Sequence, residues 1–367
     1  MEKILVVGYT TRPIVQSAVR AGFVPYAIDH FLDLDLLALA EAAAPLEEDL
    51  PDLGVGGFLE RLDLEIDGIV IGSGCERIEL EKDLNERIIG NSPDLMRKAS
   101  DKCYIGRKIT DMGFLYPEIY REGEIEFPAV IKPASGGGGL KNILVNDASE
   151  LEALDLDLSE YLIQAYVDGI PASVSVISTE DGDTASFCVN EQLIGVKWLN
   201  APSRFAYCGN IVPLETELDD EICMIAEEVV RELGLVGSNG VDFVITPDGP
   251  VVIEVNPRFQ GSLEAIEAAC GCNLFDYHMR ACEGELPELK RPERFGVRAV
   301  VYAPRDMLIE EDLRRYGFSD APSPPAEVAK GEPLASVVGS GKGRDGAVEA
   351  VKERLRGMVW CPNESDL

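Results

Sequence analysis

The segment from Gly240 to Ser262 constrains the fold of this chain more than any other. It contains two short apolar runs separated by a Pro-Asp-Gly turn, a pattern that predicts a β-hairpin. Asp242 lies in the first run, and Glu254 and Asn256 lie two residues apart in the second. On strands so paired, all three side chains would share one face. Solvated charges on an ordinary hairpin are the alternative. Because Val, Ile and Phe surround these residues, we predict a functional site.

The chemistry of these side chains indicates a site for a hard metal ion. Asp242 and Glu254 are carboxylates and Asn256 offers an amide oxygen. Oxygen ligands suit Mg²⁺ (or Mn²⁺), which fills its remaining positions with phosphate and water. Arg258 follows two residues later, and its planar guanidinium fits a carboxylate or phosphate beside the metal. We therefore predict Asp242, Glu254 and Asn256 as metal ligands and Arg258 as a catalytic residue.

The same segment carries a family resemblance. The run Glu254-Val-Asn-Pro-Arg258, with Asp242 twelve residues before Glu254, resembles the metal-binding hairpin of the ATP-grasp superfamily. Its residue pattern is most similar to that of the biotin carboxylase and carbamoyl phosphate synthetase branch. The resemblance implies an α/β (α+β) fold: an N-terminal Rossmann-like parallel sheet domain, a two-lobed ATP-binding domain and a small C-terminal lobe. It also implies ATP and Mg²⁺ as cofactors.

Length and composition favour a globular cytoplasmic protein. A chain of 367 residues, 46% hydrophobic, can bury a large core and divide into two or three domains. We expect no signal peptide, because the chain starts directly with a strand, and no membrane span, because no apolar run is long enough. The nine cysteines lack CxxC spacing, which indicates reduced thiols and neither a disulfide framework nor a zinc site.

The net charge of −33 restricts the partners of this chain. A negative field of this strength disfavours nucleic acids and anionic membranes as partners. It also repels ATP at long range, so a nucleotide site needs local lysine, arginine and magnesium. We interpret the charge as adaptation to a salt-rich cytoplasm, in which screening is short-ranged.

Residues 1–95 alternate strands and helices, with strands expected at 4–7, 23–29, 68–74 and 88–91. This predicts an open parallel sheet whose strand ends face a ligand. The turn at Gly8 lacks the G-x-G-x-x-G pattern, which argues against a dinucleotide. By the resemblance, this sheet holds the carboxylate or amine substrate. The loops at Thr10–Arg12, Asp29 and Gly72–Glu76 then face it, although each also reads as turn or helix-cap chemistry.

Two lysines and a glycine loop are expected to bind phosphate. Lys132 ends a strand and is followed by Ser135 and four consecutive glycines, Gly136, Gly137, Gly138 and Gly139. Such a loop can wrap backbone N–H groups around phosphate and close as a lid. It is not a P-loop, because no Gly-Lys-Ser/Thr follows. The resemblance assigns phosphate contacts to Lys132, which is also a candidate catalytic residue, and to Lys102, which fits the family's Asp-Lys motif.

The segment around residue 164 corresponds to the adenine-binding hinge of the superfamily. Gln164 takes the place of the family's usual glutamate, and Ala165, Tyr166 and Val167 would supply the backbone part. Glutamine accepts the same hydrogen bond but carries no charge. Many relatives also have an acid where this chain has Ala172, which leaves one ribose or phosphate contact in doubt.

The remaining segments complete the predicted organisation. We expect Lys197 and Arg204 either near the acyl phosphate or as ordinary surface charge, and an amphipathic helix over 219–233 as scaffold. We predict three domains: residues 1–95 for substrate, 96–290 for nucleotide and metal, and 291–367 as the C-terminal lobe.

By the resemblance, the function is ATP-dependent ligation, in which a carboxylate activated as an acyl phosphate is joined to an amine. One alternative is a carboxylase that uses bicarbonate through carboxyphosphate. Another is a nucleotide-binding regulatory protein without turnover. The partners are then a small-molecule carboxylate and amine. The identity of the two substrates stays open, as does the subunit number, although related enzymes are often homodimers.

Overall fold

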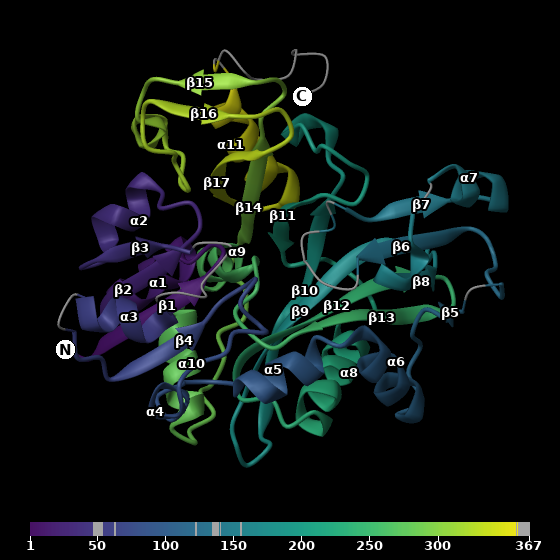
Figure 1. Cartoon of the computed structure of the whole chain (residues 1–367), viewed down its shortest axis with the longest axis horizontal. Helices are drawn as coiled ribbons and strands as arrows, with labels where there is room; N and C mark the ends of the chain where they lie inside the picture. Colours follow the sequence, from purple (N-terminus) through teal and green to yellow (C-terminus); the bar gives the residue numbers. More distant parts are fainter. Residues whose placement is uncertain are drawn as a thin grey trace.

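The computed structural model describes residues 1–46, 54–61, 64–121, 123–133, 139, 141–154, 156–356 and 358. The chain is a mixed α/β protein with one parallel sheet and several antiparallel ones (Figure 1). No described helix is both long and apolar enough to cross a membrane.

The N-terminal segment forms a four-stranded parallel sheet in the order β3-β2-β1-β4. Its strands are apolar because helices cover a parallel sheet on both faces. The predicted strand at 88–91 is present only as an isolated bridge between Ile69 of β4 and Ile88, and the fourth strand is β3, at the opposite edge beside β2. The elements are β1 (Lys3–Gly8), α1 (Arg12–Arg20), β2 (Val24–Asp29), α2 (Leu34–Leu39), β3 (Ala43–Pro45), α3 (Gly54–Arg61), β4 (Gly68–Ile71) and α4 (Lys82–Asn85).

A seven-stranded antiparallel sheet occupies the centre of the molecule, in the order β13-β12-β9-β10-β11-β14-β17 (Figure 1). Its last two strands come from the C-terminal segment and continue the sheet. The domain boundaries after residues 95 and 290 therefore remain predictions. The strands are β9 (Ile170–Ser178), β10 (Thr184–Ile194), β11 (Tyr207–Val212), β12 (Gly237–Thr246), β13 (Gly249–Asn256), β14 (Phe295–Tyr302) and β17 (Pro333–Gly341).

A smaller antiparallel sheet, in the order β5-β8-β6-β7, lies on the side of the central sheet away from the N-terminal strands (Figure 1). Two helices precede it in the chain, and a pair of short strands, β15 and β16, lies in the C-terminal segment. The elements are α5 (Pro93–Ala99), α6 (Lys102–Asp111), β5 (Ile119–Tyr120), β6 (Ala129–Pro133), β7 (Ile143–Val145), α7 (Ala148–Ala153), η1 (Leu158–Glu160), β8 (Tyr161–Ala165), β15 (Met307–Ile309), η3 (Leu313–Tyr316) and β16 (Ala326–Val328).

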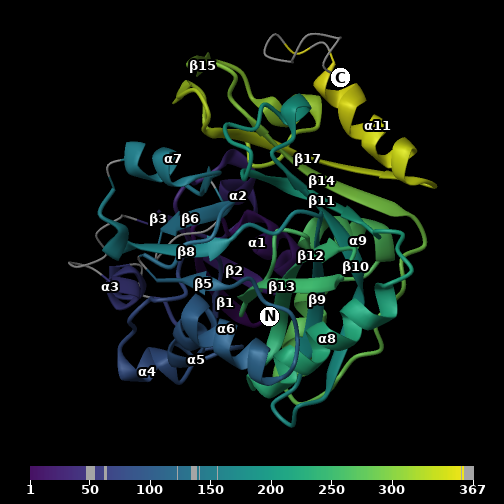
Figure 2. The same ribbon diagram turned by 90° about the vertical axis from the view of Figure 1, so that its right-hand side faces the viewer.

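Helices cover the central sheet and supply most of its apolar contacts. Helix α8 packs on β9 and β10, and α11 packs on β17 (Figure 2). The predicted apolar stripe of α8 is confirmed, because its isoleucines and valines are buried. The remaining elements are η2 (Lys197–Leu199), α8 (Asp219–Glu232), α9 (Leu263–Cys270), α10 (Leu274–Cys282) and α11 (Arg344–Leu355).

A buried charge network, formed by Arg12, Glu264, Arg298 and Asp320, joins the N-terminal sheet to the central sheet. Arg12, which is 1% exposed, donates to both carboxylate oxygens of Glu264 at 2.5 and 2.8 Å. Arg298 Nε donates to Glu264 Oε2 at 2.9 Å. The two arginines also donate to the two oxygens of Asp320, at 2.7 and 2.8 Å. Each buried charge thus faces opposite charge, which is the condition for burying it.

We expect Glu264→Ala to lower the free energy of unfolding by about 3 kcal/mol, because it leaves two buried guanidinium groups short of a partner. Equilibrium urea unfolding of the whole chain measures the change. Glu228→Ala, on the exposed face of α8, is the control and should change the free energy by less than about 0.5 kcal/mol. Equal unfolding midpoints for the Glu264 and Glu228 variants would contradict this role for the network.

Candidate functional site

The predicted hairpin is present as strands β12 and β13. Asp242 pairs directly with Glu254, and the register shifts between Asp242 and Phe243, which leaves Ile253 as the extra residue of a β-bulge. Asn256 Nδ2 donates to Asp242 Oδ2 at 3.1 Å. The structure therefore brings the three predicted metal ligands together, as the sequence spacing indicated.

The charges at the hairpin favour a bound cation. Burial and the neighbouring Glu254 carboxylate raise the pKa of Asp242 to about 7, against the lowering effect of Asn256 and Arg258. Two carboxylates this close repel each other unless positive charge lies between them. Together with the amide oxygen of Asn256, they form the oxygen-rich set that Mg²⁺ prefers. The residues thus fit the metal that the sequence predicted.

Protein cations engage the same ligand groups in this structure. Lys102 Nζ lies 3.1 Å from Glu254 Oε1, and Arg258 Nη2 donates to Asn256 Oδ1 at 3.0 Å. The Lys102 contact partly neutralises Glu254, and the charge of Arg258 attracts both Glu254 and Asp242. A metal bound through Glu254 and Asn256 would therefore exchange partners with Lys102 and Arg258.

Arg258 is held by the N-terminal segment as well as by the hairpin. Its Nε donates to Glu76 Oε1 at 2.7 Å, from the loop that follows β4. Its Nη1 donates to the carbonyl oxygen of Phe259 at 3.0 Å. Burial opposes ionisation of Glu76, but Arg258 outweighs it and lowers the pKa of Glu76 below its usual value. The guanidinium is thereby fixed in orientation between the parallel sheet and the hairpin of β12 and β13, called the metal hairpin below for its predicted ligands.

The two predicted phosphate lysines converge on Glu254 from different elements. Lys102 begins α6 and contacts Glu254 directly, whereas Lys132 ends β6. Burial lowers the pKa of Lys132 to about 8, in a balance that includes attraction by Glu254 and repulsion by Lys102. Lys132 Nζ also donates to Gln164 Oε1 at 2.7 Å. The structure thus groups Lys102, Lys132, Gln164 and Glu254 where the smaller sheet faces β13.

The predicted adenine hinge is only partly free for a ligand. Gln164 is buried on β8, where its Nε2 donates to the Pro117 carbonyl at 3.3 Å. The backbone N–H groups of Ala165 and Tyr166 already donate to carbonyl groups of the chain. The Val167 N–H has no such acceptor in the described part of the chain. Val167 is therefore the hinge residue whose amide remains open to a nucleotide.

The described end of the glycine loop lies against a second loop. Ser135, Gly136, Gly137 and Gly138 lie outside the described residues. Gly139 has a φ of +69°, and a Cβ at this position would overlap the Phe205 carbonyl oxygen, so only glycine fits. The Arg204 guanidinium carbon lies 5.5 Å from the ring centroids of both Tyr166 and Phe205. Arg204 thus reaches the hinge. Lys197 is exposed on η2 and, in the described structure, contacts no predicted site residue.

Sequence reasoning missed Gln260. Its Nε2 donates to Asp242 Oδ1 at 3.3 Å, and its Oε1 accepts from Ser175 Oγ at 2.7 Å. The signal was present in the alternation of Asn256, Arg258 and Gln260 along the chain. Glu76 was named only as part of a substrate-facing loop, and nothing in the sequence identifies Arg258 as its partner.

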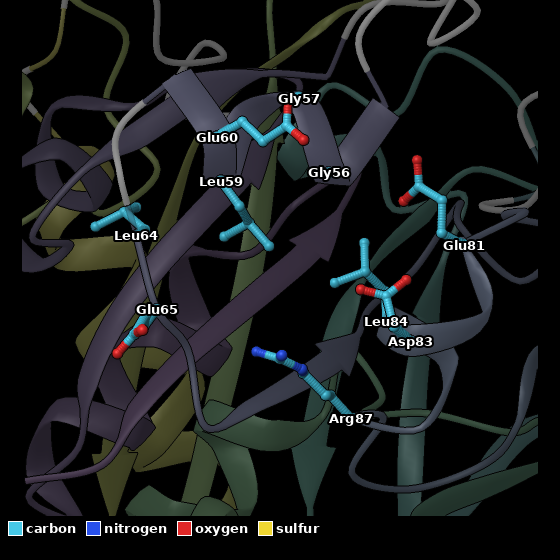
Figure 3. A pocket seen from close by; sticks show the side chains of 10 residues that line it. All are labelled: Gly56, Gly57, Leu59, Glu60, Leu64, Glu65, Glu81, Asp83, Leu84 and Arg87. Carbon is cyan, nitrogen blue, oxygen red and sulfur yellow. The ribbon is translucent and has the colours of Figure 1, made fainter.

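A hollow in the N-terminal segment is lined by other residues (Figure 3). It is bordered by α3, α4 and Arg87, and none of the predicted site residues lines it. Acidic side chains dominate the polar part of its lining, which consists of Gly56, Gly57, Leu59, Glu60, Leu64, Glu65, Glu81, Asp83, Leu84 and Arg87.

Comparison with known proteins agrees with the geometry of the hairpin. Residues 99–262 match a family model described as an ATP-grasp domain. An uncharacterized protein of Methanocaldococcus jannaschii is 27% identical over 354 residues, which cover 92% of this chain and 88% of that protein. The large chain of carbamoyl phosphate synthase from Methanoculleus marisnigri is 26% identical over 52% of this chain, but the match spans only 20% of that protein.

Solved structures share the fold over nearly the whole chain. N5-carboxyaminoimidazole ribonucleotide synthetase from Thermotoga maritima superposes with a TM-score of 0.68 at 22% identity, covering 96% of this chain and 97% of the other. Biotin carboxylase from Campylobacter jejuni gives 0.72 at 16%, covering 96% and 90%. L-amino acid ligase from Bacillus licheniformis gives 0.71 at 16%, covering 96% and 97%.

We expect Asp242→Asn to abolish the stabilisation of this protein by Mg²⁺ and ADP, because it removes one of the two carboxylates of the hairpin. A ligand present at about 100 times its Kd stabilises a protein by about 2.7 kcal/mol, so the wild-type thermal midpoint should rise clearly. Thermal unfolding with MgCl2 plus ADP, or with EDTA, measures this. Asp248→Asn, in the exposed turn of the same hairpin, is the matched control. An unchanged rise in the Asp242 variant would exclude it as a ligand.

Proposed function

Because this chain belongs to the ATP-grasp family through its domain at residues 99–262, we propose that it is an ATP-dependent ligase. It would activate a carboxylate as an acyl phosphate and join it to an amine, with release of ADP and phosphate. The observation that carries this proposal is the convergence of two lysines and an anchored arginine on the carboxylate pair of one hairpin. The full-length similarity to an amino acid ligase supports the fold on which it rests.

The nucleotide would lie between the smaller sheet and β13. Lys102 and Lys132 would donate to the phosphates, and the Val167 amide would face the adenine edge. Gln164, by the family resemblance, would accept from the adenine amino group. Mg²⁺ held by Asp242, Glu254 and Asn256 would neutralise phosphate charge, including the charge that develops on the leaving ADP. Orientation and charge placement, without a protein nucleophile, would then supply the catalysis.

The substrate carboxylate would be oriented by Arg258, whose fork matches a carboxylate. One carboxylate oxygen attacks the γ-phosphorus, the bond to the bridging oxygen of ADP breaks, and an acyl phosphate forms. The amine nitrogen then attacks the acyl carbon, the carbon–oxygen bond to phosphate breaks, and the amine proton leaves with phosphate or solvent. Glu76 would act as a positioning residue that holds the guanidinium for the first step.

We expect the release of ADP from Mg-ATP to depend on a carboxylate and an amine together. The assay is ADP and phosphate release across a panel of amino acids, amines, small dicarboxylates and bicarbonate, at high potassium concentration because of the net charge of −33. Glu254→Gln should lower the release by more than about 100-fold, because it removes a ligand charge of the metal. Asp248→Asn is the control and should retain the rate.

Other results of the panel would contradict the proposal in distinct ways. Release with bicarbonate alone would indicate carboxyphosphate chemistry. Binding of ATP without release under any condition would indicate a regulatory protein. A Glu254→Gln variant with the wild-type rate would overturn the metal assignment.

We expect Glu76→Gln to raise the KM for the carboxylate substrate about tenfold while the KM for ATP changes less than about twofold. Loss of the ionic contact frees the Arg258 guanidinium, which touches the carboxylate and not the adenine. Steady-state kinetics with the acid found in the panel measure both constants. Glu79→Gln, an exposed glutamate of the same loop, is the control. Equal increases of both constants would assign Glu76 a general structural role instead.

A further inference from the structure

An acidic cluster, formed by Asp29, Asp33, Asp35 and Asp320, lies where the end of β2 meets the C-terminal segment. Two of the four carboxylates belong to the buried structure around Arg12. Asp35 accepts from the backbone N–H groups of Asp320 and Ala321, at 3.0 and 3.1 Å, and lies 3.2 Å from Arg12 Nε. Asp320 is bonded to both arginines of the charge network. Their charges are therefore already compensated.

The hydrogen-bonding capacity of the Asp29 carboxylate is filled as well. One of its oxygens accepts from the Thr11 backbone N–H at 2.5 Å and from the Thr11 hydroxyl at 2.8 Å. Its other oxygen accepts from the N–H groups of Phe31 and Leu32, at 2.8 and 3.0 Å. These bonds fold the loop after β2 and leave Asp29 no free capacity that a ligand would need.

Asp33 differs from the other three. Its side chain is only 6% exposed, yet it accepts no hydrogen bond and forms no ion pair with any described residue. The next residue is pinned beside the cluster, because the Leu34 N–H donates to the Ala321 carbonyl at 2.8 Å. Burial, followed by the charges of Asp320, Asp35 and Asp29, raises the pKa of Asp33 to about 8, against the lowering effect of Arg12. A buried carboxylate without a partner destabilises a fold, so its presence needs another reason.

Asp33 also remains reachable. Among the described residues, Ser203 Oγ is the side-chain polar atom that is both shielded from solvent and without a hydrogen-bond partner. The oxygens of Asp33 do not meet both conditions. The unpaired oxygens of Asp33 are therefore not fully enclosed by the described residues.

We propose that Asp33 binds the ammonium group of the amine substrate, and that this substrate carries a second amino group. The proposal rests on the ligase function proposed above. Asp33 is the member of this cluster whose carboxylate has no hydrogen bond or ion pair with a described residue, and a cation would supply that partner. An ammonium needs few acceptors, whereas no group of three or more His, Cys, Asp or Glu side chains in the described chain is placed to hold a metal. An amino group bound as ammonium has no lone pair, so another amino group must attack the acyl phosphate.

Polar groups connect this cluster with the metal hairpin. Glu264 of the charge network lies on α9, which begins shortly after Arg258 in the chain. Tyr207 touches both regions: its hydroxyl donates to Asn210, which pairs with Arg298 across β11 and β14, and it lies against Gly261, three residues after Arg258. A substrate with an amino group at each end would span a site divided in this way.

The test is isothermal titration calorimetry on the full chain without ATP. The probes are 1,4-diaminobutane and L-lysine, with butylamine and L-norleucine as the matched monoamines. We expect the wild type to bind a diamino probe at least about tenfold more tightly than its monoamine partner, and Asp33→Asn to lose this difference. Asp248→Asn is the control and should bind as the wild type does. Failure of both diamino probes to bind the wild type, or equal affinity in the Asp33 variant, would overturn the proposal.

Thermal unfolding without amine separates a ligand-binding role from a structural one. Asp33→Asn removes an unpaired buried acid, so its midpoint should rise by about 1–3 °C. A lower midpoint would assign Asp33 a structural role and overturn the proposal. The same measurement with KCl, compared with tetramethylammonium chloride at equal ionic strength, tests for an inorganic cation. If KCl stabilises the wild type but not the Asp33 variant, and 1,4-diaminobutane does not compete with it, the proposal is overturned in favour of an inorganic cation.

The panel assay distinguishes the two proposals from each other. Diamine binding through Asp33 without any acid-dependent ADP release would contradict the ligase function alone. Release that requires both acid and amine, with the same KM for the amine in Asp33→Asn, would contradict the role of Asp33 alone.

Discussion

The structure depends on the double clamp that Glu264 and Asp320 form around two buried arginines. Arg12 comes from the first helix and Arg298 from a strand near the C-terminal end, so the clamp joins parts of the chain that are 286 residues apart. Guanidinium groups with two-point contacts fix direction as well as distance. The parallel sheet is therefore held in one orientation against the central sheet, which dispersive packing alone would specify less strictly.

That orientation is what makes the Arg258–Glu76 contact possible. Glu76 lies in the loop after β4 of the parallel sheet and Arg258 lies two residues after β13, so their contact depends on how the two sheets are oriented. The proposed carboxylate site thus inherits its precision from a network that touches no substrate. Stability and positioning are here two effects of the same buried charges.

Local patterns predicted the parts of this molecule in which neighbours in sequence interact. The hairpin, its Asp242–Glu254 pairing and the buried stripe of α8 follow from periodicity and turn chemistry. Strand β3 was missed because Ala43–Pro45 is short and lacks β-branched residues. Glu76 and Asp33 could not be identified as special, because their character depends on groups far along the chain. Asp33 precedes α2 at the capping position, and only the folded structure shows that its side chain makes no capping hydrogen bond.

The contacts of Lys102 and Arg258 with the metal ligands have a consequence for the order of events. Both cations occupy the oxygens that a metal would use, so a lone ion must displace them and leave two positive groups without partners. Under the proposed function, nucleotide phosphates would supply those partners. Binding of the metal and of the nucleotide would then be thermodynamically linked, and each would raise the affinity for the other. In a cell rich in free cations, such a site would respond to the metal–nucleotide complex and ignore the ions alone.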